Sequence, residues 1–147
     1  MVEKAYNSLM IQVSKSPQET QKIAAELLKK IDSFKAKGAK VIALEGELGA
    51  GKTVFVKGLA KALKMKGKIK SPTFTIMRKY GHVYHLDCYR LKDENDLKTL
   101  GIDEILKNPD NLVLIEWSDR VKKILPGKHV KIHIDHISDT ERKITIS

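Results

Sequence analysis

Apolar and polar positions along the chain follow two alternating patterns, one typical of buried strands and one typical of amphipathic helices. Residues 41–44 and 112–115 are continuous apolar runs, which suits strands of a parallel sheet covered on both faces. Apolar residues recur at helical spacing in residues 23–31 and 55–63. Because helices and strands alternate through the first two thirds of the chain, we predict an α/β fold with a mainly parallel central sheet flanked by helices.

Local signals predict where the two longer helices begin and end. Ser16 is followed by Pro17 and, three residues after the serine, by Glu19, which is a capping-box start for the first helix. Gly38 is expected to end that segment. The second helix is expected to begin after residue 52 and to close at Gly67.

The other segments predict shorter elements and one domain. We expect a first strand at 9–13, a hairpin with arms 73–80 and 83–87, one or two short helices at 93–106 broken at Gly101, a short helix at 119–125, and a closing antiparallel pair at 129–137 and 142–146. The sequence has no internal repeat, low-complexity tract or long linker. We therefore expect residues 1–147 to form a single domain.

A glycine-rich segment between the predicted buried strand and the second helix carries the strongest chemical signal. It fits the pattern G-x-x-x-x-G-K-[ST] and consists of Gly46, Glu47, Leu48, Gly49, Ala50, Gly51, Lys52 and Thr53. Glycine lets backbone amides approach phosphate oxygens, the lysine adds a positive charge at the β- and γ-phosphates, and the threonine hydroxyl serves Mg²⁺. The flanking strand and helix favour this interpretation over a glycine-rich turn that binds nothing. We therefore predict a P-loop that binds ATP with Mg²⁺.

Two carboxylates follow predicted strands in positions that suit such a site. Glu116 ends the apolar run 112–115, and Asp87 ends the strand that begins at residue 83. At the carboxyl ends of parallel strands, both acids would open onto one crevice and could hold magnesium or its water ligands. The alternative is that either acid caps its strand or pairs with a lysine.

A third polar segment, the loop of Ser71, Thr73 and Thr75, precedes a strand. It could act as a switch that senses the γ-phosphate, although a segment of this composition is more often an ordinary turn.

Charge and composition indicate what kind of ligand or partner the protein binds and where in the cell it acts. The 147 residues include 28 Lys and Arg against 18 Asp and Glu, a net charge of +10, which favours a polyanionic ligand or partner. The lysines are spread along the chain, so they could equally serve solubility.

The sequence has no run of about 20 apolar residues and no signal-peptide core in residues 1–7, so we expect a cytosolic protein that makes no membrane contact.

Several other histidine, aspartate and cysteine residues could suggest a metal site or a nucleophile, and we interpret them differently. The residues His129, His133, Asp135 and His136 could suggest a metal site, but an exposed alternating strand accounts for them better. The single cysteine, Cys88, has no obvious base beside it, so we expect a packed residue. His85 and Asp87 share a face of one strand, and we hypothesise a hydrogen bond between them that positions Asp87.

Four sequence blocks resemble the TsaE family, once called YjeE, over about residues 16–126. They are the P-loop, Ser71-Pro72-Thr73-Phe74-Thr75, the H-x-D-x-Y-R block with His85, Asp87, Tyr89 and Arg90, and Leu100-Gly101 followed by Ile115-Glu116-Trp117. The family usually has proline after that tryptophan, where this chain has Ser118. It also often carries a glycine-arginine pair near the nucleotide, where this chain has Glu141-Arg142.

The resemblance implies a fold, a function and a set of site residues. TsaE proteins are weak ATPases of the P-loop NTPase fold that support synthesis of N6-threonylcarbamoyladenosine in tRNA. They act with the TsaB–TsaD complex, which they reset between turnovers, and tRNA is met within that complex. Lys52 and the loop amides would hold phosphates, Thr53 and Glu116 would serve magnesium, and Asp87 would support magnesium or orient water. Candidates for further nucleotide contacts are Thr20, Trp117 and Arg142.

Two other functions remain open at this point. A small-molecule kinase would share the fold, but the arginine-bearing lid of such kinases is not evident among Arg78, Arg90, Arg120 and Arg142. A non-hydrolysing, nucleotide-dependent scaffold would not need two acids at the strand ends. A GTPase is disfavoured because the chain lacks an Asn-Lys-x-Asp guanine motif.

Overall fold

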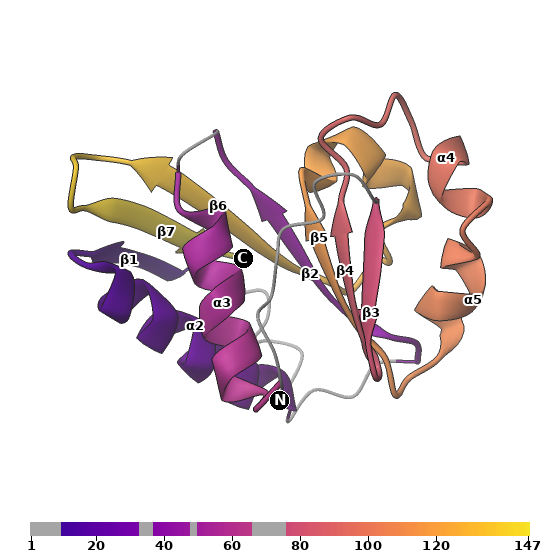
Figure 1. Cartoon of the computed structure of the whole chain (residues 1–147), viewed down its shortest axis with the longest axis horizontal. Coiled ribbons are helices and arrows are strands. Elements are labelled where there is room, and N and C mark those ends of the chain that lie inside the picture. Colours follow the sequence, from indigo (N-terminus) through magenta and orange to yellow (C-terminus); the bar gives the residue numbers. More distant parts are fainter. Residues whose placement is uncertain (1–9, 33–36, 48–49, 66–75) are drawn as a thin grey trace. The chain divides into compact units, whose positions relative to one another are not determined.

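The computed structural model describes residues 10–32, 37–47, 50–65 and 76–147 (Figure 1). The chain divides into two compact units, which are described separately. The first unit comprises residues 1–35, 46–71 and 131–147, and the second comprises 36–45 and 72–130. That the whole chain behaves as a single domain stays a prediction.

The first unit combines a small antiparallel sheet with two helices. Its elements are β1 (Met10–Ser14), α2 (Pro17–Asp32), α3 (Lys52–Ala62), β6 (Val130–His136) and β7 (Arg142–Ile146). Strand β7 pairs with β1 on one side and with β6 on the other, both antiparallel. The closing pair of β6 and β7 was predicted, whereas the pairing of β7 with β1 was not.

The two helices of the first unit pack against each other (Figure 1). The five apolar residues that predicted the face of α2 are all buried, namely Ile23, Ala24, Leu27, Leu28 and Ile31. Phe55 and Leu59 of α3 are buried as predicted, but Ala62 is exposed. The expected closing residue Gly67 lies outside the described residues, as does the segment between the end of α2 and Lys37.

Gly58 sets how closely α2 and α3 approach. A Cβ added at this position would lie 2.6 Å from Cα of Gln21 and 3.0 Å from Cβ of Ala24. Both distances are shorter than ordinary carbon contacts, and one of them involves backbone that cannot swing away. A glycine inside a helix costs about 1 kcal/mol relative to alanine, and this close helix contact offsets that cost.

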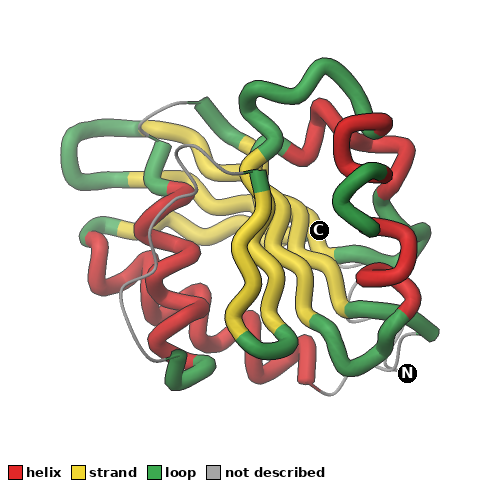
Figure 2. The backbone as a smooth tube through the Cα atoms, turned by 45° about the vertical axis from the view of Figure 1, so that its right-hand side comes forward, coloured by secondary structure: helices red, strands yellow, loops and turns green. Residues whose placement is uncertain are grey.

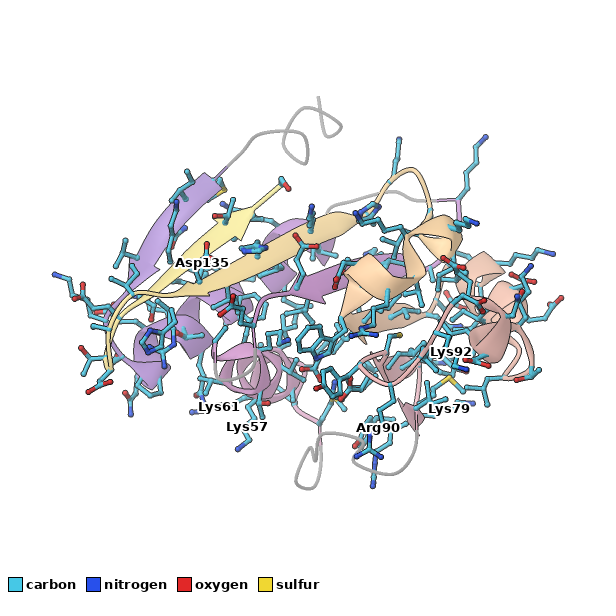
Figure 3. All side chains as sticks on the ribbon, turned by 90° about the horizontal axis from the view of Figure 1, so that it is seen from above. Lys57, Lys61, Lys79, Arg90, Lys92 and Asp135 are labelled. Carbon is cyan, nitrogen blue, oxygen red and sulfur yellow. The ribbon has the colours of Figure 1, made fainter. Side chains whose placement is uncertain are left out.

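We expect Gly58→Ala to lower the free energy of unfolding by about 1–3 kcal/mol, because the added methyl group forces α2 and α3 apart. Urea denaturation followed by circular dichroism measures this change. The matched control is Lys57→Ala, an exposed neighbour on the same helix, which should stay within about 0.5 kcal/mol of wild type. Figure 3 shows Lys57 and Lys61 projecting from α3. A Gly58→Ala protein as stable as wild type would show that the two helices are not tightly packed.

The second unit contains the parallel part of the fold. Its strands are β2 (Lys40–Glu45), β5 (Leu112–Glu116), β4 (Val83–Asp87) and β3 (Met77–Tyr80), in that order (Figure 1). Figure 2 shows strands, in yellow, lying side by side. Strands β2, β5 and β4 are parallel, and β3 pairs antiparallel with β4 through the turn at Gly81-His82. This arrangement confirms the predicted α/β class with a mainly parallel core, a hairpin and C-terminal antiparallel strands.

Short helices complete the core of the second unit. They are α4 (Asn95–Lys98), α5 (Ile102–Lys107) and the 3₁₀ helix η1 (Ser118–Ile124). Their apolar residues Leu97, Ile102, Ile105 and Val121 join the core formed by strand residues such as Leu86 and Ile115. The predicted break at Gly101 is confirmed, since this residue has φ of +79° between α4 and α5. Within the described residues, no helix is long and apolar enough to cross a membrane.

Candidate functional site

The glycine-rich loop begins where β2 ends. Leu44 of β2 lies opposite Glu116 of β5, and the chain reaches Gly46 two residues later. Gly46 has φ of +144°, and an added Cβ would lie 2.5 Å from the carbonyl oxygen of Ile134. Gly51 has φ of +104° and stands directly before α3. Both positions therefore require glycine, for backbone conformation and, at Gly46, also for space.

Lys52 is the first residue of α3, and its side chain turns back over the loop. Its Nζ atom donates a hydrogen bond to the carbonyl oxygen of Gly46 at 2.6 Å, and the residue is 6% exposed. The next residue, Thr53, is exposed in the first turn of the helix. The carbonyl oxygen of Glu47 accepts a bond from the amide of Ala50 at 3.1 Å. The loop residues Leu48 and Gly49 lie outside the described part of the chain.

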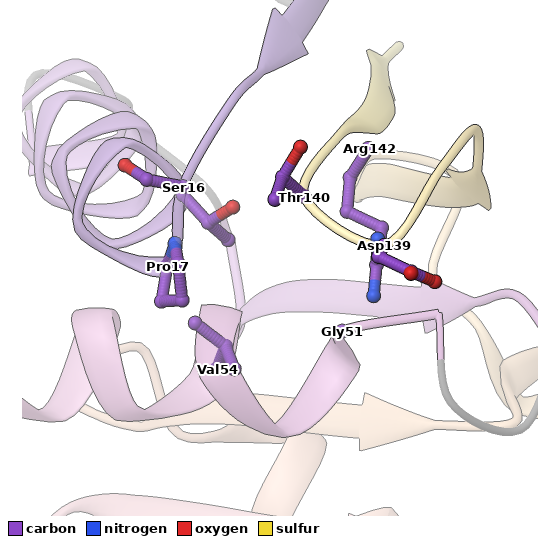
Figure 4. A pocket seen from close by; sticks show the side chains of 8 residues that line it. Ser16, Pro17, Gly51, Val54, Asp139, Thr140 and Arg142 are labelled. Atoms are coloured by element: carbon purple, nitrogen blue, oxygen red, sulfur yellow. The ribbon is translucent and has the colours of Figure 1, made fainter.

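A pocket in the first unit brings the loop together with two other predicted residues (Figure 4). Thr20, Gly51 and Arg142 were predicted as nucleotide contacts from separate parts of the sequence, and all three line this pocket. The guanidinium of Arg142 donates to the carbonyl oxygens of Ser138 at 2.6 Å and Glu141 at 2.9 Å. The arginine thereby fixes the β6–β7 turn beside the loop glycine. The full lining is Ser16, Pro17, Thr20, Gly51, Val54, Asp139, Thr140 and Arg142.

The start of α2 forms one wall of this pocket. Ser16 Oγ accepts a hydrogen bond from the amide of Glu19 at 3.1 Å, as the capping-box prediction requires. Glu19 Oε2 accepts from the amide of Lys15 at 2.7 Å, one residue earlier than the motif predicts. The hydroxyl groups of Thr20 and Ser14 lie 2.7 Å apart. Thr20 is buried, so this bond fixes its hydroxyl group at the pocket.

The two acids lie together in the second unit. Asp87 and Glu116 are register partners at the carboxyl ends of the parallel strands β4 and β5. Asp87 is half-buried, and its Oδ1 accepts a hydrogen bond from the amide of Tyr89 at 3.1 Å. Glu116 is 4% exposed. Two carboxylates at adjacent strand ends are a donor set that suits Mg²⁺, which often takes one or two carboxylates and completes its shell with water and phosphate.

The hypothesis that His85 hydrogen-bonds to Asp87 is wrong. His85 Nε2 lies 2.6 Å from Glu116 Oε2, and Nδ1 of this histidine has no hydrogen-bond partner among the described residues. Strand register explains the difference, because His85 and Glu116 project from neighbouring strands on one face of the sheet. The Asp87 carboxylate is instead engaged by the turn that follows its own strand.

Cys88 is a packed residue, as the sequence predicted. It is fully buried, and burial raises the pKa of its thiol to about 12, with smaller contributions from the negative charges of Asp87, Glu116 and Asp119. A fully buried thiol with a raised pKa is a poor nucleophile at neutral pH.

The raised pKa of Cys88 predicts a loss of stability at alkaline pH. The folded thiol keeps its proton to a higher pH than the unfolded thiol, whose pKa is 9.0, so its contribution is complete below about pH 9 and declines as the pH rises toward 12. Relative to Cys88→Ala, wild type should lose about 2 kcal/mol of unfolding free energy between about pH 8 and pH 10.5. Urea denaturation of both proteins measures the difference, and parallel pH curves would contradict the assignment.

An aromatic and cationic cluster follows the two acids. The rings of Tyr89 and Trp117 have centroids 4.9 Å apart, and Arg120 lies over them at 5.6 and 6.0 Å. Trp117 adopts φ of +57°, which is uncommon for a residue with a side chain and turns the backbone sharply after β5. Arg90 is exposed and points away from the ribbon (Figure 3). Sequence analysis named Arg120 only in weighing a kinase lid and did not predict its contact with these rings.

The histidine-rich segment set aside above forms an alternating strand. His133 Nε2 lies 2.9 Å from Asp135 Oδ1 at the surface of β6, and His129 Nδ1 lies 2.7 Å from the carbonyl oxygen of Pro126. Among the residues that the structure describes, no group of three or more His, Cys, Asp or Glu side chains is arranged to hold a metal ion. The switch-like loop of Ser71, Thr73 and Thr75 lies outside the described residues, so its role stays a prediction.

Three curated proteins similar to this chain share one description. The tRNA threonylcarbamoyladenosine biosynthesis protein TsaE of Bacillus subtilis strain 168 is 39% identical over 136 residues, covering 90% of this chain and 81% of the relative. The protein of the same description from Haemophilus influenzae is 38% identical, covering 78% of this chain and 73% of the relative. The one from Aquifex aeolicus is 34% identical, covering 91% and 92%.

A solved structure and a family model agree with these relatives. The crystal structure of Bacillus subtilis YdiB superposes with a TM-score of 0.70 and 34% identity, covering 95% of this chain and 84% of that one. The model of the family described as "Threonylcarbamoyl adenosine biosynthesis protein TsaE" matches residues 14–144. Since this match covers most of the sequence and several relatives exceed 30% identity over most of both chains, the chain belongs to the TsaE family.

Proposed function

We propose that this protein binds and hydrolyses ATP as a subunit of the system that makes N6-threonylcarbamoyladenosine in tRNA. The observation that carries the proposal is the loop of the first unit, where Gly46 and Gly51 have positive φ and Lys52 turns back onto Gly46. Asp87 and Glu116, at the ends of the parallel strands β4 and β5 of the second unit, support it. Parallel strands present their carboxyl ends at one edge of a sheet, where ligands bind in open α/β folds. The chain itself continues from that end of β2 into Gly46.

Nucleotide binding follows from the loop geometry. The positive φ angles of Gly46 and Gly51 let the backbone approach a phosphate closely, and α3 begins with its positive dipole end at the loop. We assign the phosphates to the loop amides and to Lys52. The pocket beside Gly51, which Thr20 and Arg142 also line, is the proposed place of the nucleoside. Trp117 is kept as a further candidate contact.

The acids support hydrolysis as well as binding. We assign Mg²⁺ to the hydroxyl of Thr53 and to Glu116, with Asp87 acting on the metal through water or on the attacking water. When bound, magnesium neutralises charge on the β- and γ-phosphates. Lys52 adds a fixed positive charge that stabilises the same phosphates, and its neighbours in the loop hold them in one geometry.

The relatives' description supplies the biological reaction. Those proteins are named for tRNA threonylcarbamoyladenosine biosynthesis, and the same role is proposed for this chain. The proposed partners are TsaB and TsaD, with tRNA met within their complex. The net charge of +10 is compatible with a polyanion nearby.

The contacts of the arginine side chains lead us to expect that ATP hydrolysis depends on partner proteins. Phosphoryl transfer is often accelerated roughly 10³–10⁵-fold by an arginine placed on the transferring phosphate. Two of the four arginines have other contacts, since Arg120 lies over aromatic rings and Arg142 bonds to turn carbonyls. We therefore expect slow hydrolysis by the isolated protein and faster hydrolysis with its partners.

ATP hydrolysis by the purified protein, alone and with TsaB and TsaD, tests this function. The proposal expects low activity that rises with the partner pair. A rate of ATP consumption that is unchanged by the partners but rises with a small phosphoryl acceptor would indicate a kinase instead. Tight ATP binding without hydrolysis under either condition would indicate a nucleotide-controlled scaffold.

A further inference from the structure

We propose that His85 is a positioning residue that fixes the carboxylate of Glu116 for catalysis. The proposal rests on the proposed function, because it assumes that Glu116 serves ATP hydrolysis. Its basis is the 2.6 Å contact between His85 Nε2 and Glu116 Oε2, which joins neighbouring strands from residues 31 positions apart. Both residues are almost fully buried, at 2% and 4% exposed, so the bond is shielded from water.

The contact assigns the hydrogen atom on the imidazole ring. An ionised carboxylate accepts hydrogen bonds and donates none, so Nε2 must carry the hydrogen that points at Glu116. His85 Nδ1 is buried without a partner among the described residues. A ring with hydrogen on Nε2 alone leaves an acceptor unpaired at Nδ1, whereas a second hydrogen there would leave a buried donor unpaired. In both cases Nε2 is the ring atom that donates to the carboxylate.

Glu116 needs such a constraint because of its place in the chain. It is the last residue of β5, and the next residue, Trp117, leaves the strand with φ of +57°. A glutamate side chain has three rotatable bonds, so strand geometry alone does not fix its carboxylate. His85 is anchored inside β4, between neighbours on both sides of the strand. The bond occupies Oε2, and Oε1 is the oxygen that we assign to magnesium or to its water.

Arrangements of this kind are known as a general device around metal sites. A residue that orients a metal-binding carboxylate typically contributes about 10- to 100-fold to activity or metal affinity. His85 contributes by limiting the orientations of Glu116 and not by touching nucleotide. Its loss should therefore act on turnover and on the magnesium requirement, and it should leave nucleotide binding almost unchanged.

The test compares two substitutions at one position. His85→Leu removes the donor, and His85→Gln keeps an amide donor near the place of Nε2. In ATP hydrolysis assays with TsaB and TsaD present, His85→Leu should lower kcat about 10- to 100-fold and raise the magnesium concentration that gives half-maximal activity. KM for ATP should change less than about threefold, and His85→Gln should recover most of the lost rate. His82→Gln is the matched control, because His82 is an exposed histidine at the turn of the same hairpin.

A double-substitution cycle separates positioning from a general loss of structure. If His85 acts through Glu116, His85→Leu should cause little further loss in a Glu116→Ala background, where no side chain at position 116 can accept the hydrogen bond. Equal loss in both backgrounds, or a failure of His85→Gln to restore turnover while its thermal unfolding matches wild type, would overturn the proposal. Full activity of the single Glu116→Gln variant would instead reject the proposed role of Glu116 itself, so the two failures are distinguishable.

Discussion

Replacing Lys52 with alanine is expected to lower ATP turnover about 10²–10³-fold, the largest loss that we predict for one side chain. Lys52 is buried at the start of α3, and its ammonium group already lies on the carbonyl of Gly46, within the loop that is to hold the phosphates. Alanine removes the positive charge without placing another group there. Steady-state hydrolysis with the partner proteins measures the change.

Two comparisons make the Lys52 result specific. Lys57→Ala removes a lysine from the exposed side of the same helix and should keep wild-type turnover. Binding of a fluorescent ATP analogue should weaken in Lys52→Ala and stay unchanged in Lys57→Ala. If Lys52→Ala retained wild-type turnover, the loop would not be the catalytic nucleotide site.

The second large effect is expected for Glu116→Gln. Glutamine keeps the volume and still offers an oxygen to His85 Nε2, but it removes the negative charge assigned to magnesium. We expect turnover to fall about 10²-fold, because charge stabilisation of the phosphates depends on the correctly held metal. The measurement is ATP hydrolysis as a function of magnesium concentration, together with thermal unfolding to show that the fold persists.

Glu104→Gln is the matched control for that experiment. Glu104 is an exposed carboxylate on α5 and has no assigned role, so its loss should leave both turnover and the magnesium dependence unchanged. An equal fall in both variants would indicate a nonspecific effect of net charge. Retention of full activity in Glu116→Gln would require another residue to serve the metal.

Local sequence signals predicted most of the elements that position the candidate site. The continuous apolar runs became β2 and β5, and the acid that follows the second run is the last residue of β5. The break between α4 and α5 was predictable because Gly101 adopts a conformation that few other residues tolerate. The Ser16–Glu19 cap was predictable because both partners lie within one helical turn.

Features that depend on contacts between distant segments were not predictable in the same way. The partner of His85 comes from a strand 31 residues away, and spacing along one strand had favoured Asp87 instead. The pairing of β1 with β7 joins segments near opposite ends of the sequence, from Met10 with Ile146 to Ser14 with Arg142, and has no local sequence signal. Alternation indicates which face a strand buries but not which strand becomes its neighbour.

Multiple-turnover formation of N6-threonylcarbamoyladenosine in tRNA tests the central claim most directly. TsaB and TsaD would be supplied with tRNA, activated threonylcarbamoyl donor, ATP and either the wild-type chain or Lys52→Ala, and modified tRNA would be counted per TsaD. We predict sustained turnover with wild type and about one round with Lys52→Ala or without the chain. Sustained turnover that does not depend on this chain, or that persists with Lys52→Ala, would contradict the account.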